Sequence, residues 1–475
     1  MAAGTIDTES VGRYLRRPTV VPPLDPGFRP AWLAWRALEA AAIDSAAPCR
    51  VSIAVEQPSG PVFVREALLL DEGHPDASAG TAFCERLVKS MLWTYGGNRV
   101  WVDGPAGLAD ALGRHYAASA TGSFDARLMG TDIYRAPFEV VAAPRADFPL
   151  PSDGPTPLGG HLDGCRIGFD LGASDRKVAA VVEGEVVFSE EVPWDPAGQQ
   201  DPQWHLEQID ASLRRAAAHL PRVDAIGGSA AGVYVDNEVR VASLFRSVPR
   251  DQFDRRVRGL FKELRAAWGV PFVVVNDGEV TALAGAMQAG VGGLLGVAMG
   301  SSEAAGYVTP AGALTSRLNE LAFVPIDYAP DAPTDEWSGD RGCGVGYLSQ
   351  QAAGRLLPRA GIDVEPGTPL PERLVRLQAL MARGDPRARL VYETIGTYLG
   401  YALLEYGRFF EFGHLLLLGR VMTGAGGDVI VNRACGVLEV EEPATAASLT
   451  FLETSERTKR HGQAVAAASL PQITA

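Results

Sequence analysis

The spacing of apolar and polar residues changes repeatedly between a strand period and a helix period along the first third of the chain. Apolar runs of strand length occupy 51–55, 62–70 and 99–102, and apolar residues at helical spacing occupy 30–46, 81–93 and 106–116. This alternation predicts an α/β unit of its own. Proline and glycine concentrate over 148–160, so we place a linker there. We predict an N-terminal accessory α/β domain over 1–155, which begins with an extended arm over 1–28.

The rest of the chain contains the order strand, glycine turn, strand twice. The first set of predicted strands lies at 166–171, 177–182, 185–190, 224–228 and 272–276, with helices over 204–219 and 250–268. The second set has strands at 295–299, 307–309 and 415–418, a polar glycine turn over 300–306 and a long helix over 385–410. We therefore predict two lobes, 156–290 and 291–475, and expect the last helix to return to the first lobe.

Composition narrows the classes of function. The net charge is −14 without a basic block, which argues against a nucleic-acid partner. The five cysteines are scattered without a CxxC pair, as expected for free thiols in a reducing cytoplasm, so we predict a cytoplasmic protein. No apolar run is long and uninterrupted enough to predict a membrane span. Small-molecule partners are favoured.

Candidate chemistry begins at the end of the strand that contains Asp170. A carboxylate at a strand end, followed by Gly172, Ala173 and Ser174, suits a turn that approaches a phosphate closely while the carboxylate holds a hydrated magnesium ion. Taken alone, this segment could also be an ordinary hairpin. The same alternative holds for 300–306, and Asn276 and Asp277 could simply cap the helix that follows them.

Four segments occur in an order that resembles the ROK sugar kinases. They are Asp170 to Lys177, Val273 to Leu283, Val297 to Tyr307, and Leu415 to Gly426. In that family, whose fold is the two-lobed actin-like (ribonuclease H-like) ATPase fold, corresponding segments are the first phosphate motif, the segment of the catalytic aspartate, the second phosphate motif and the adenosine motif. The resemblance implies an α/β protein of this fold with an additional N-terminal α/β domain. It also implies an ATP- and Mg²⁺-dependent carbohydrate kinase, which is usually a homodimer.

The resemblance assigns roles to individual residues. Asp277 would be the catalytic base, Asn276, Asp277 and Glu320 would bind the sugar, and Asp170 would position magnesium, through water. Nucleotide contacts would come from Asp170, Gly172, Ala173, Ser174, Lys177, Gly300, Ser301, Ser302, Gly419, Gly424 and Gly426. Glu320 could instead be a solvated charge at a strand edge.

Three positions depart from the family pattern. Phe323 replaces a histidine that binds both sugar and zinc, and Cys343 stands where a cysteine cluster is expected, so we predict no zinc site. Phe323 would also present an apolar wall, which favours a modified sugar, an aminosugar or a cyclitol as acceptor. Glu303 adds an acidic residue to the second phosphate turn, and Arg176 or Arg317 could offset its charge.

Two questions stay open at this stage. The phosphoryl donor could be ATP or polyphosphate. The chain could also be a non-catalytic sugar- or nucleotide-binding regulator of the same fold, an alternative that Phe323 and Glu303 suggest.

Overall fold

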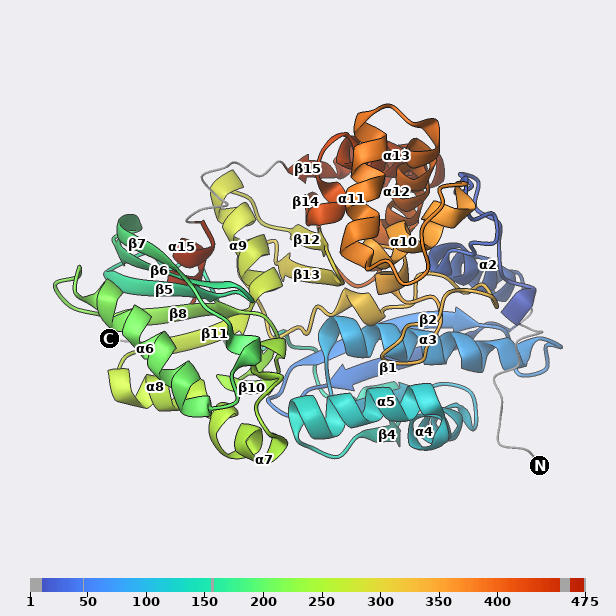
Figure 1. Ribbon diagram of the computed structural model, residues 1–475. Helices are drawn as coiled ribbons and strands as arrows, with labels where there is room; N and C mark the ends of the chain where they lie inside the picture. Colours follow the sequence, from blue (N-terminus) through green and yellow to red (C-terminus); the bar gives the residue numbers. More distant parts are fainter. Residues whose placement is uncertain (1–10, 46, 155–157, 453–461, 474–475) are drawn as a thin grey trace.

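The computed structural model describes residues 11–45, 47–154, 158–452 and 462–473. An N-terminal unit contains a four-stranded sheet in the order β2-β1-β3-β4 (Figure 1). Its strands are β1 (Cys49–Glu56), β2 (Val62–Leu69), β3 (Arg99–Asp103) and β4 (Glu139–Ala142). Its helices are α2 (Ala31–Asp44), α3 (Ala77–Tyr95), α4 (Leu108–Ala118), α5 (Ala120–Arg127) and the π-helix η1 (Leu128–Tyr134). The helices and strands predicted in this region are present, with bounds that differ by a few residues. Three residues of the predicted linker, 155–157, lie outside the described residues.

The first lobe is built on a five-stranded sheet in the order β11-β8-β5-β6-β7. The strands are β5 (Cys165–Leu171), β6 (Asp175–Val182), β7 (Glu185–Pro193), β8 (Ala225–Ala230) and β11 (Phe272–Asn276). A small hairpin, β9 (Val233–Val235) and β10 (Glu238–Val241), lies beside β11. The main helices are α6 (Pro202–Ala217) and α8 (Leu260–Trp268). The helix predicted over 250–268 is broken into α7 (Arg250–Gln252), the π-helix η5 (Phe253–Val257) and α8.

The second lobe is built on a four-stranded sheet in the order β13-β12-β14-β15. Its strands are β12 (Leu294–Met299), β13 (Glu303–Val308), β14 (His414–Leu418) and β15 (Thr450–Leu452). Its helices are α10 (Gln350–Arg359), α11 (Leu370–Ala382), α12 (Pro386–Tyr406), α13 (Ala425–Glu441) and α14 (Pro443–Ser448). The strand predicted at 307–309 begins earlier, at Glu303, so the turn before it is shorter than expected. Helices α10, α11 and α13 had no predicted counterpart.

Two helices lie between the sheets of the lobes. Helix α9 (Asp277–Ala289) follows β11 directly and packs on β12 and β13, and Figure 1 shows it between the two lobes. The short helix α15 (Gln463–Ala468) packs on α9 and on β5, β6 and β8 of the first lobe. The last described helix, α15, therefore lies on the sheet of the first lobe. Among the described residues, no helix is both long and apolar enough to cross a membrane.

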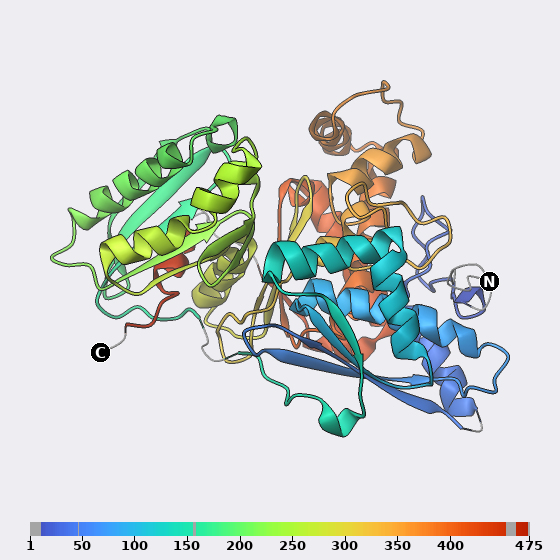
Figure 2. The same cartoon turned by 90° about the horizontal axis from the view of Figure 1, so that it is seen from below.

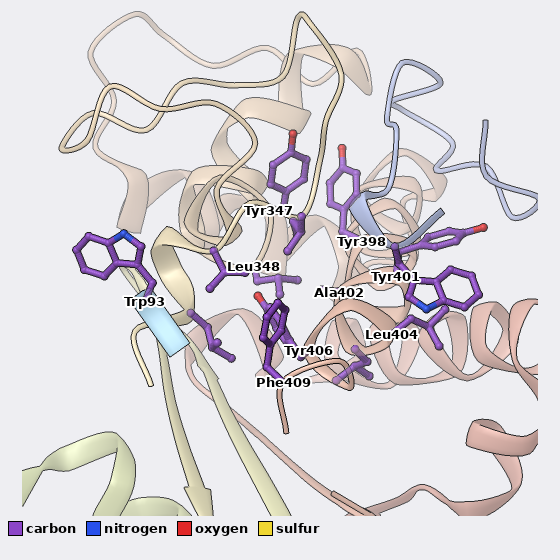
Figure 3. Close-up of a cluster of buried hydrophobic side chains, with 14 of the residues drawn as sticks. Trp93, Tyr347, Leu348, Tyr398, Tyr401, Ala402, Leu404, Tyr406 and Phe409 are labelled. Carbon is purple, nitrogen blue, oxygen red and sulfur yellow. The ribbon is translucent and has the colours of Figure 1, made fainter. Parts of the chain in front are cut away.

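The N-terminal unit and the second lobe share one hydrophobic core. A single buried cluster joins side chains of α2, α3 and β1 to side chains of β12, α10 and α12. In Figure 3, side chains of α12, such as Tyr398 and Tyr406, gather beside Tyr347 of the segment before α10, and Trp93 of α3 stands at the edge of this cluster. The segment 11–28 also packs here, because Phe28 lies 5.0 Å from the ring of Tyr398 and the Leu24 N–H donates to Thr394. Figure 2 shows the first lobe beside the block that these two parts form.

Candidate functional site

Parallel pairing brings two strand-end carboxylates to one edge of the first sheet. Strands β5 and β11 both run parallel to β8, and the register pairs Asp170 with Ser229 and Ser229 with Val275. Asp277 follows two positions after Val275, so it lies at the same carboxyl edge as Asp170. Asp170 Oδ1 accepts a hydrogen bond of 2.7 Å from Ser229 Oγ. Burial raises the pKa of Asp170, and the negative charge of Asp277 raises it further.

The first predicted phosphate turn is a tight hairpin between β5 and β6. The Gly172 N–H donates to the carbonyl of Asp175 at 2.9 Å, and Trp194 donates to the carbonyls of Gly172 and Ser174 at 2.9 and 3.0 Å. Ala173 and Ser174 are exposed at its tip. The turn is thus held through its own backbone groups, one of which accepts from the Trp194 indole, and its tip stays exposed.

Lys177 and Arg176, two charged residues that follow this turn, point to opposite faces of β6. Lys177 Nζ lies 3.2 Å from Asp175 Oδ1 and 4.0 Å from Asp170 Oδ2, so a cation faces the strand-end carboxylate. Arg176, which we expected could offset the charge of Glu303, is buried, and its Nε donates to Ser212 of α6 at 2.8 Å. Successive residues of a strand point to opposite faces, which explains the difference. Arg176 is therefore not available to offset charge in the second turn.

Asn276 and Asp277 stand where β11 becomes α9. Asn276 Oδ1 accepts from the Gly278 N–H at 2.7 Å, so the helix-capping interpretation of Asn276 is confirmed. Asn276 Nδ2 donates to the carbonyl of Gly232 at 2.8 Å. Asp277 is half-buried, and burial raises the pKa of its carboxyl group. A carboxylate of raised basicity is better suited to accept a proton than an exposed one.

The second predicted phosphate turn joins β12 to β13. The Gly300 N–H donates to the carbonyl of Ser302 at 2.9 Å, while Ser301 and Ser302 are exposed. Glu303 does not project a charge into this turn. It is buried, its Oε1 accepts from Tyr406 Oη at 2.8 Å, and burial raises its pKa to about 8. The carboxyl group is therefore largely neutral at pH 7, which removes the charge conflict that we expected from the sequence.

The predicted adenosine motif begins beside the second turn. Strand β14 runs parallel to β12, and Gly419, with φ of 94°, follows β14. A β-carbon at Gly419 would stand 2.4 Å from the carbonyl oxygen of Met299, so only glycine fits there. Gly424 precedes α13 as its N-cap. A β-carbon at Gly426 would strike the ring of Tyr392 at 2.3 Å, so helix packing already requires glycine at that position.

Glu320 lies in a loop that the N-terminal unit holds. The Glu320 N–H donates to the Trp93 carbonyl at 2.9 Å, and the Asn319 N–H donates to the Thr94 carbonyl at 3.0 Å. Both carbonyls belong to the last turn of α3, where helix carbonyls lack helical partners. Burial, with a smaller effect of Asp277, raises the pKa of Glu320 to about 7. Glu320 thus lies within electrostatic reach of Asp277, and it is not a fully solvated charge.

Sequence reasoning missed a further carboxyl group, Glu279. It is buried in the first turn of α9, it accepts from Asn319 Nδ2 at 3.1 Å, and burial raises its pKa to about 8. Its position two residues after Asp277 could have identified it as a neighbour of the site. Asn319 itself has φ of 56°, which asparagine tolerates better than most residues.

A cavity of about 1010 Å³ adjoins these residues. Asn276, Glu279 and Glu320 line it from the lobes, and Gln57, Ser59 and Tyr134 line it from the N-terminal unit. Gln57 Nε2 donates to the carbonyls of Tyr95 and Ser316 at 2.7 and 2.8 Å and so ties the end of α3 to the loop before Glu320. The N-terminal unit therefore forms one wall of this cavity.

Phe323 does not line the cavity. Its ring stacks on Trp93 with centroids 4.0 Å apart, and it packs with the buried Cys343. The apolar wall that we expected Phe323 to present to a sugar is thus turned toward the N-terminal unit. Nearby, Lys89 Nζ is fully buried and lies 2.9 Å from Asp125 and 3.1 Å from Asp340. Over the described ranges, no three His, Cys, Asp or Glu residues are grouped so that they could hold a metal ion.

Comparison with known proteins shows the fold. The chain is 18% identical to the ROK hexokinase from Thermus thermophilus, with a TM-score of 0.51 over 64% of this chain and 96% of the hexokinase. It is 20% identical to a ROK family transcriptional regulator, a homolog of the E. coli MLC protein, with a TM-score of 0.52 over 65% of this chain and 78% of the regulator. No family model and no curated protein matches the chain. The fold is therefore that of the ROK proteins, and the predicted fold class is confirmed.

Proposed function

We propose that the chain is a ROK-type carbohydrate kinase, which transfers the γ-phosphoryl group of ATP to a hydroxyl of a sugar, aminosugar or cyclitol. The observation that carries the proposal is the pair of strand-end carboxylates, Asp170 and Asp277, at one edge of the first sheet. Helix α9 carries Asp277 against β13, next to the second turn, so one helix N-terminus adjoins parts of both lobes. The fold shared with a ROK hexokinase supports this assignment.

The chemistry distributes over these residues as follows. Asp277 accepts the proton of the attacking hydroxyl, and the elevated pKa of its carboxyl group favours that transfer. Asn276 and Glu320 orient the acceptor by hydrogen bonds, with Glu320 held in place by α3. Magnesium, positioned by Asp170 through water, would neutralise charge that develops on the phosphates.

The nucleotide would lie along the two turns and the adenosine motif. Amides and hydroxyls of Gly172, Ala173 and Ser174 face it from the first lobe, with Lys177 as a nearby cation, and Gly300, Ser301 and Ser302 face it from the second lobe. Gly419, Gly424 and Gly426 would let the backbone pass close to the adenosine. We keep a homodimer and a cytoplasmic location as parts of the proposal.

The second candidate is a sugar- or nucleotide-binding regulator without turnover. The fold shared with a ROK transcriptional regulator favours it. The neutral, inward-facing Glu303 and the inward-facing Phe323 weaken it, because neither residue obstructs the candidate site.

A panel of sugars, aminosugars and cyclitols, assayed for phosphoryl transfer from ATP and from polyphosphate, separates the two candidates. We expect turnover with at least one acceptor and a decrease in kcat of about 10²- to 10⁴-fold in Asp277→Asn. Asp147→Asn, which changes an exposed carboxylate in the N-terminal unit, is the matched control and should keep full activity. Thermal shifts with sugars but no transfer to any acceptor would leave the regulator as the function.

A further inference from the structure

A second cavity, of about 480 Å³, lies where the N-terminal unit meets the first lobe. Its walls come from η1 on one side and from the end of β10 and the segment 245–253 on the other. None of the candidate-site residues lines it. The volume is that of a typical small-ligand pocket, which spans about 300 to 1000 Å³.

Three arginines line this cavity, and their charges are incompletely balanced. Arg240, Arg246 and Arg250 face it together with one carboxylate, Asp132. Asp132 Oδ1 lies 3.7 Å from Arg250, which also lies 3.3 Å from Asp254, a residue that does not line the cavity. The other oxygen of Asp132 pairs with Arg127 at 2.8 Å. The side chain of Arg246 is exposed and has no hydrogen bond or ion pair with any described residue.

Arg240 is the most unusual of the three because it is 91% buried, with 9% of its side chain exposed. Its Nε and Nη1 have no hydrogen-bond acceptor among the described residues, although Nη1 lies 2.9 Å from Glu238 Oε2. Glu238 also pairs with Lys262 at 2.6 Å and with Arg135 at 3.8 Å, so three cations share one carboxylate. A buried guanidinium with unused donors is expensive unless an anion satisfies it.

We propose that this cavity binds a small phosphate monoester, with its phosphate group held by Arg240, Arg246 and Arg250. A phosphate offers three acceptor oxygens to forked guanidinium donors, which suits several converging arginines better than a single carboxylate does. The rings of Phe245 and Phe253 give the remaining wall an apolar surface for the organic part of the ligand. Binding here would tie η1 to the first lobe.

The test uses the full-length protein and isothermal titration with inorganic phosphate, glucose 6-phosphate and glucose. We expect saturable binding of glucose 6-phosphate that is tighter than that of inorganic phosphate. Arg240→Gln and Arg246→Gln should each weaken it at least ~10-fold, because each removes a charge-assisted hydrogen bond. Arg246 is exposed, so its variant tests the site even if Arg240→Gln fails to fold. Arg255→Gln, which changes an exposed arginine of η5 that does not line the cavity, should leave the affinity unchanged.

Asp277→Asn separates this inference from the proposed function. Its affinity for glucose 6-phosphate should equal that of the unmodified chain, because the second cavity is a different place; loss of binding would assign the probe to the candidate site and overturn the inference. Absence of saturable binding, equal affinity for inorganic phosphate and glucose 6-phosphate, or full affinity in Arg246→Gln would overturn it as well. None of these results depends on catalytic turnover.

Discussion

The N-terminal unit makes two contacts that differ in extent. Against the second lobe it contributes to one continuous hydrophobic core and buries the ammonium group of Lys89. Against the first lobe the contact is smaller. Val233 and Val235 of β9 pack on the edge of the same cluster, Arg135, which follows η1, lies 3.8 Å from Glu238 of β10, and two cavities adjoin this contact. Large apolar interfaces move as one body, whereas small polar ones allow relative motion. We therefore expect the N-terminal unit and the second lobe to behave as a single block, and any relative motion to occur between this block and the first lobe.

The largest effect should follow from breaking the buried ion pairs of Lys89. In Lys89→Met, Asp125 would lose the only cation that pairs with it in the described part of the chain, and Asp340 would lose one of two there. Removal of one partner from a buried ion pair costs about 3–5 kcal/mol. Urea denaturation should show this loss, and hydrogen exchange should increase in both the N-terminal unit and the second lobe. Arg50→Met, which breaks an exposed pair with Glu66, should cost less than about 1 kcal/mol. Faster exchange confined to the N-terminal unit would contradict the single block.

Glu303 lies in the same block, and its substitution should increase stability instead of decreasing it. Its pKa is raised to about 8, so between the ordinary carboxyl pKa and pH 8 the folded state keeps a proton that the unfolded chain releases. Stability therefore falls as the pH rises through this window. Glu303→Gln keeps an acceptor for Tyr406 and cannot ionise, so its Tm should exceed that of the unmodified chain by at least ~2 °C at pH 8 and by little at pH 4.

Thermal unfolding followed from pH 4 to pH 9 measures this difference. Exposed Glu336, changed to Gln, is the control and should give a pH profile parallel to that of the unmodified chain. A parallel profile for Glu303→Gln as well would show that Glu303 is ionised in the folded state.

Gln57 lies where the block borders the large cavity, so its effect should be intermediate. Gln57→Ala removes the hydrogen bonds to the carbonyls of Tyr95 and Ser316, with an expected loss of about 1–3 kcal/mol. Hydrogen exchange over 315–320 should become faster, and KM for the acceptor should increase more than kcat falls. Ser59→Ala, at an exposed position on the same cavity wall, should change neither. Unchanged exchange over 315–320 would mean that α3 alone holds the loop.

The smallest effect should come from the polar contact with the first lobe. Arg135→Ala removes an exposed, long ion pair with Glu238, and such pairs contribute about 0–1 kcal/mol. The free energy of unfolding should therefore be nearly unchanged, while small-angle scattering should show a wider range of lobe separations. A loss as large as that in Lys89→Met would remove the distinction between the two contacts.

Local pattern was enough to predict the elements that carry the candidate site. The β5–β6 hairpin, β11, the start of α9 and the β12–β13 hairpin follow from alternating apolar residues, a glycine turn and an Asn–Asp pair before a helix. The orientation of Glu303 could not be predicted, because it depends on Tyr406 of α12, which is distant in sequence. Because β13 was predicted to begin at 307 and begins at Glu303, Glu303 was wrongly predicted to lie in the turn that faces the phosphates.

Contacts between parts of the chain that are far apart in the sequence could not be predicted. Phe323 stacks on Trp93, and the end of α3 accepts the N–H group of Glu320. Both contacts depend on how the N-terminal unit packs against the second lobe, and the spacing of apolar residues along the chain does not predict that packing. Helices α10 and α11 could have been predicted, because Ala353 and Leu357 in α10, and Leu374 and Leu377 in α11, recur at helical spacing. Arg240 was missed because a buried, unsatisfied arginine has no sequence signature.

The end of α3 holds the loop of Glu320 partly through backbone atoms. The Trp93 and Thr94 carbonyls accept the N–H groups of Glu320 and Asn319, and these two hydrogen bonds do not require a particular side chain in that last turn. A change in the length of α3 would have a larger effect. Each residue inserted into or deleted from α3 would advance or retract its end by about 1.5 Å and rotate it by about 100°. The length of α3 therefore sets the position of the loop that contains Glu320, and a change in that length would move Glu320 without altering any side chain of the candidate site.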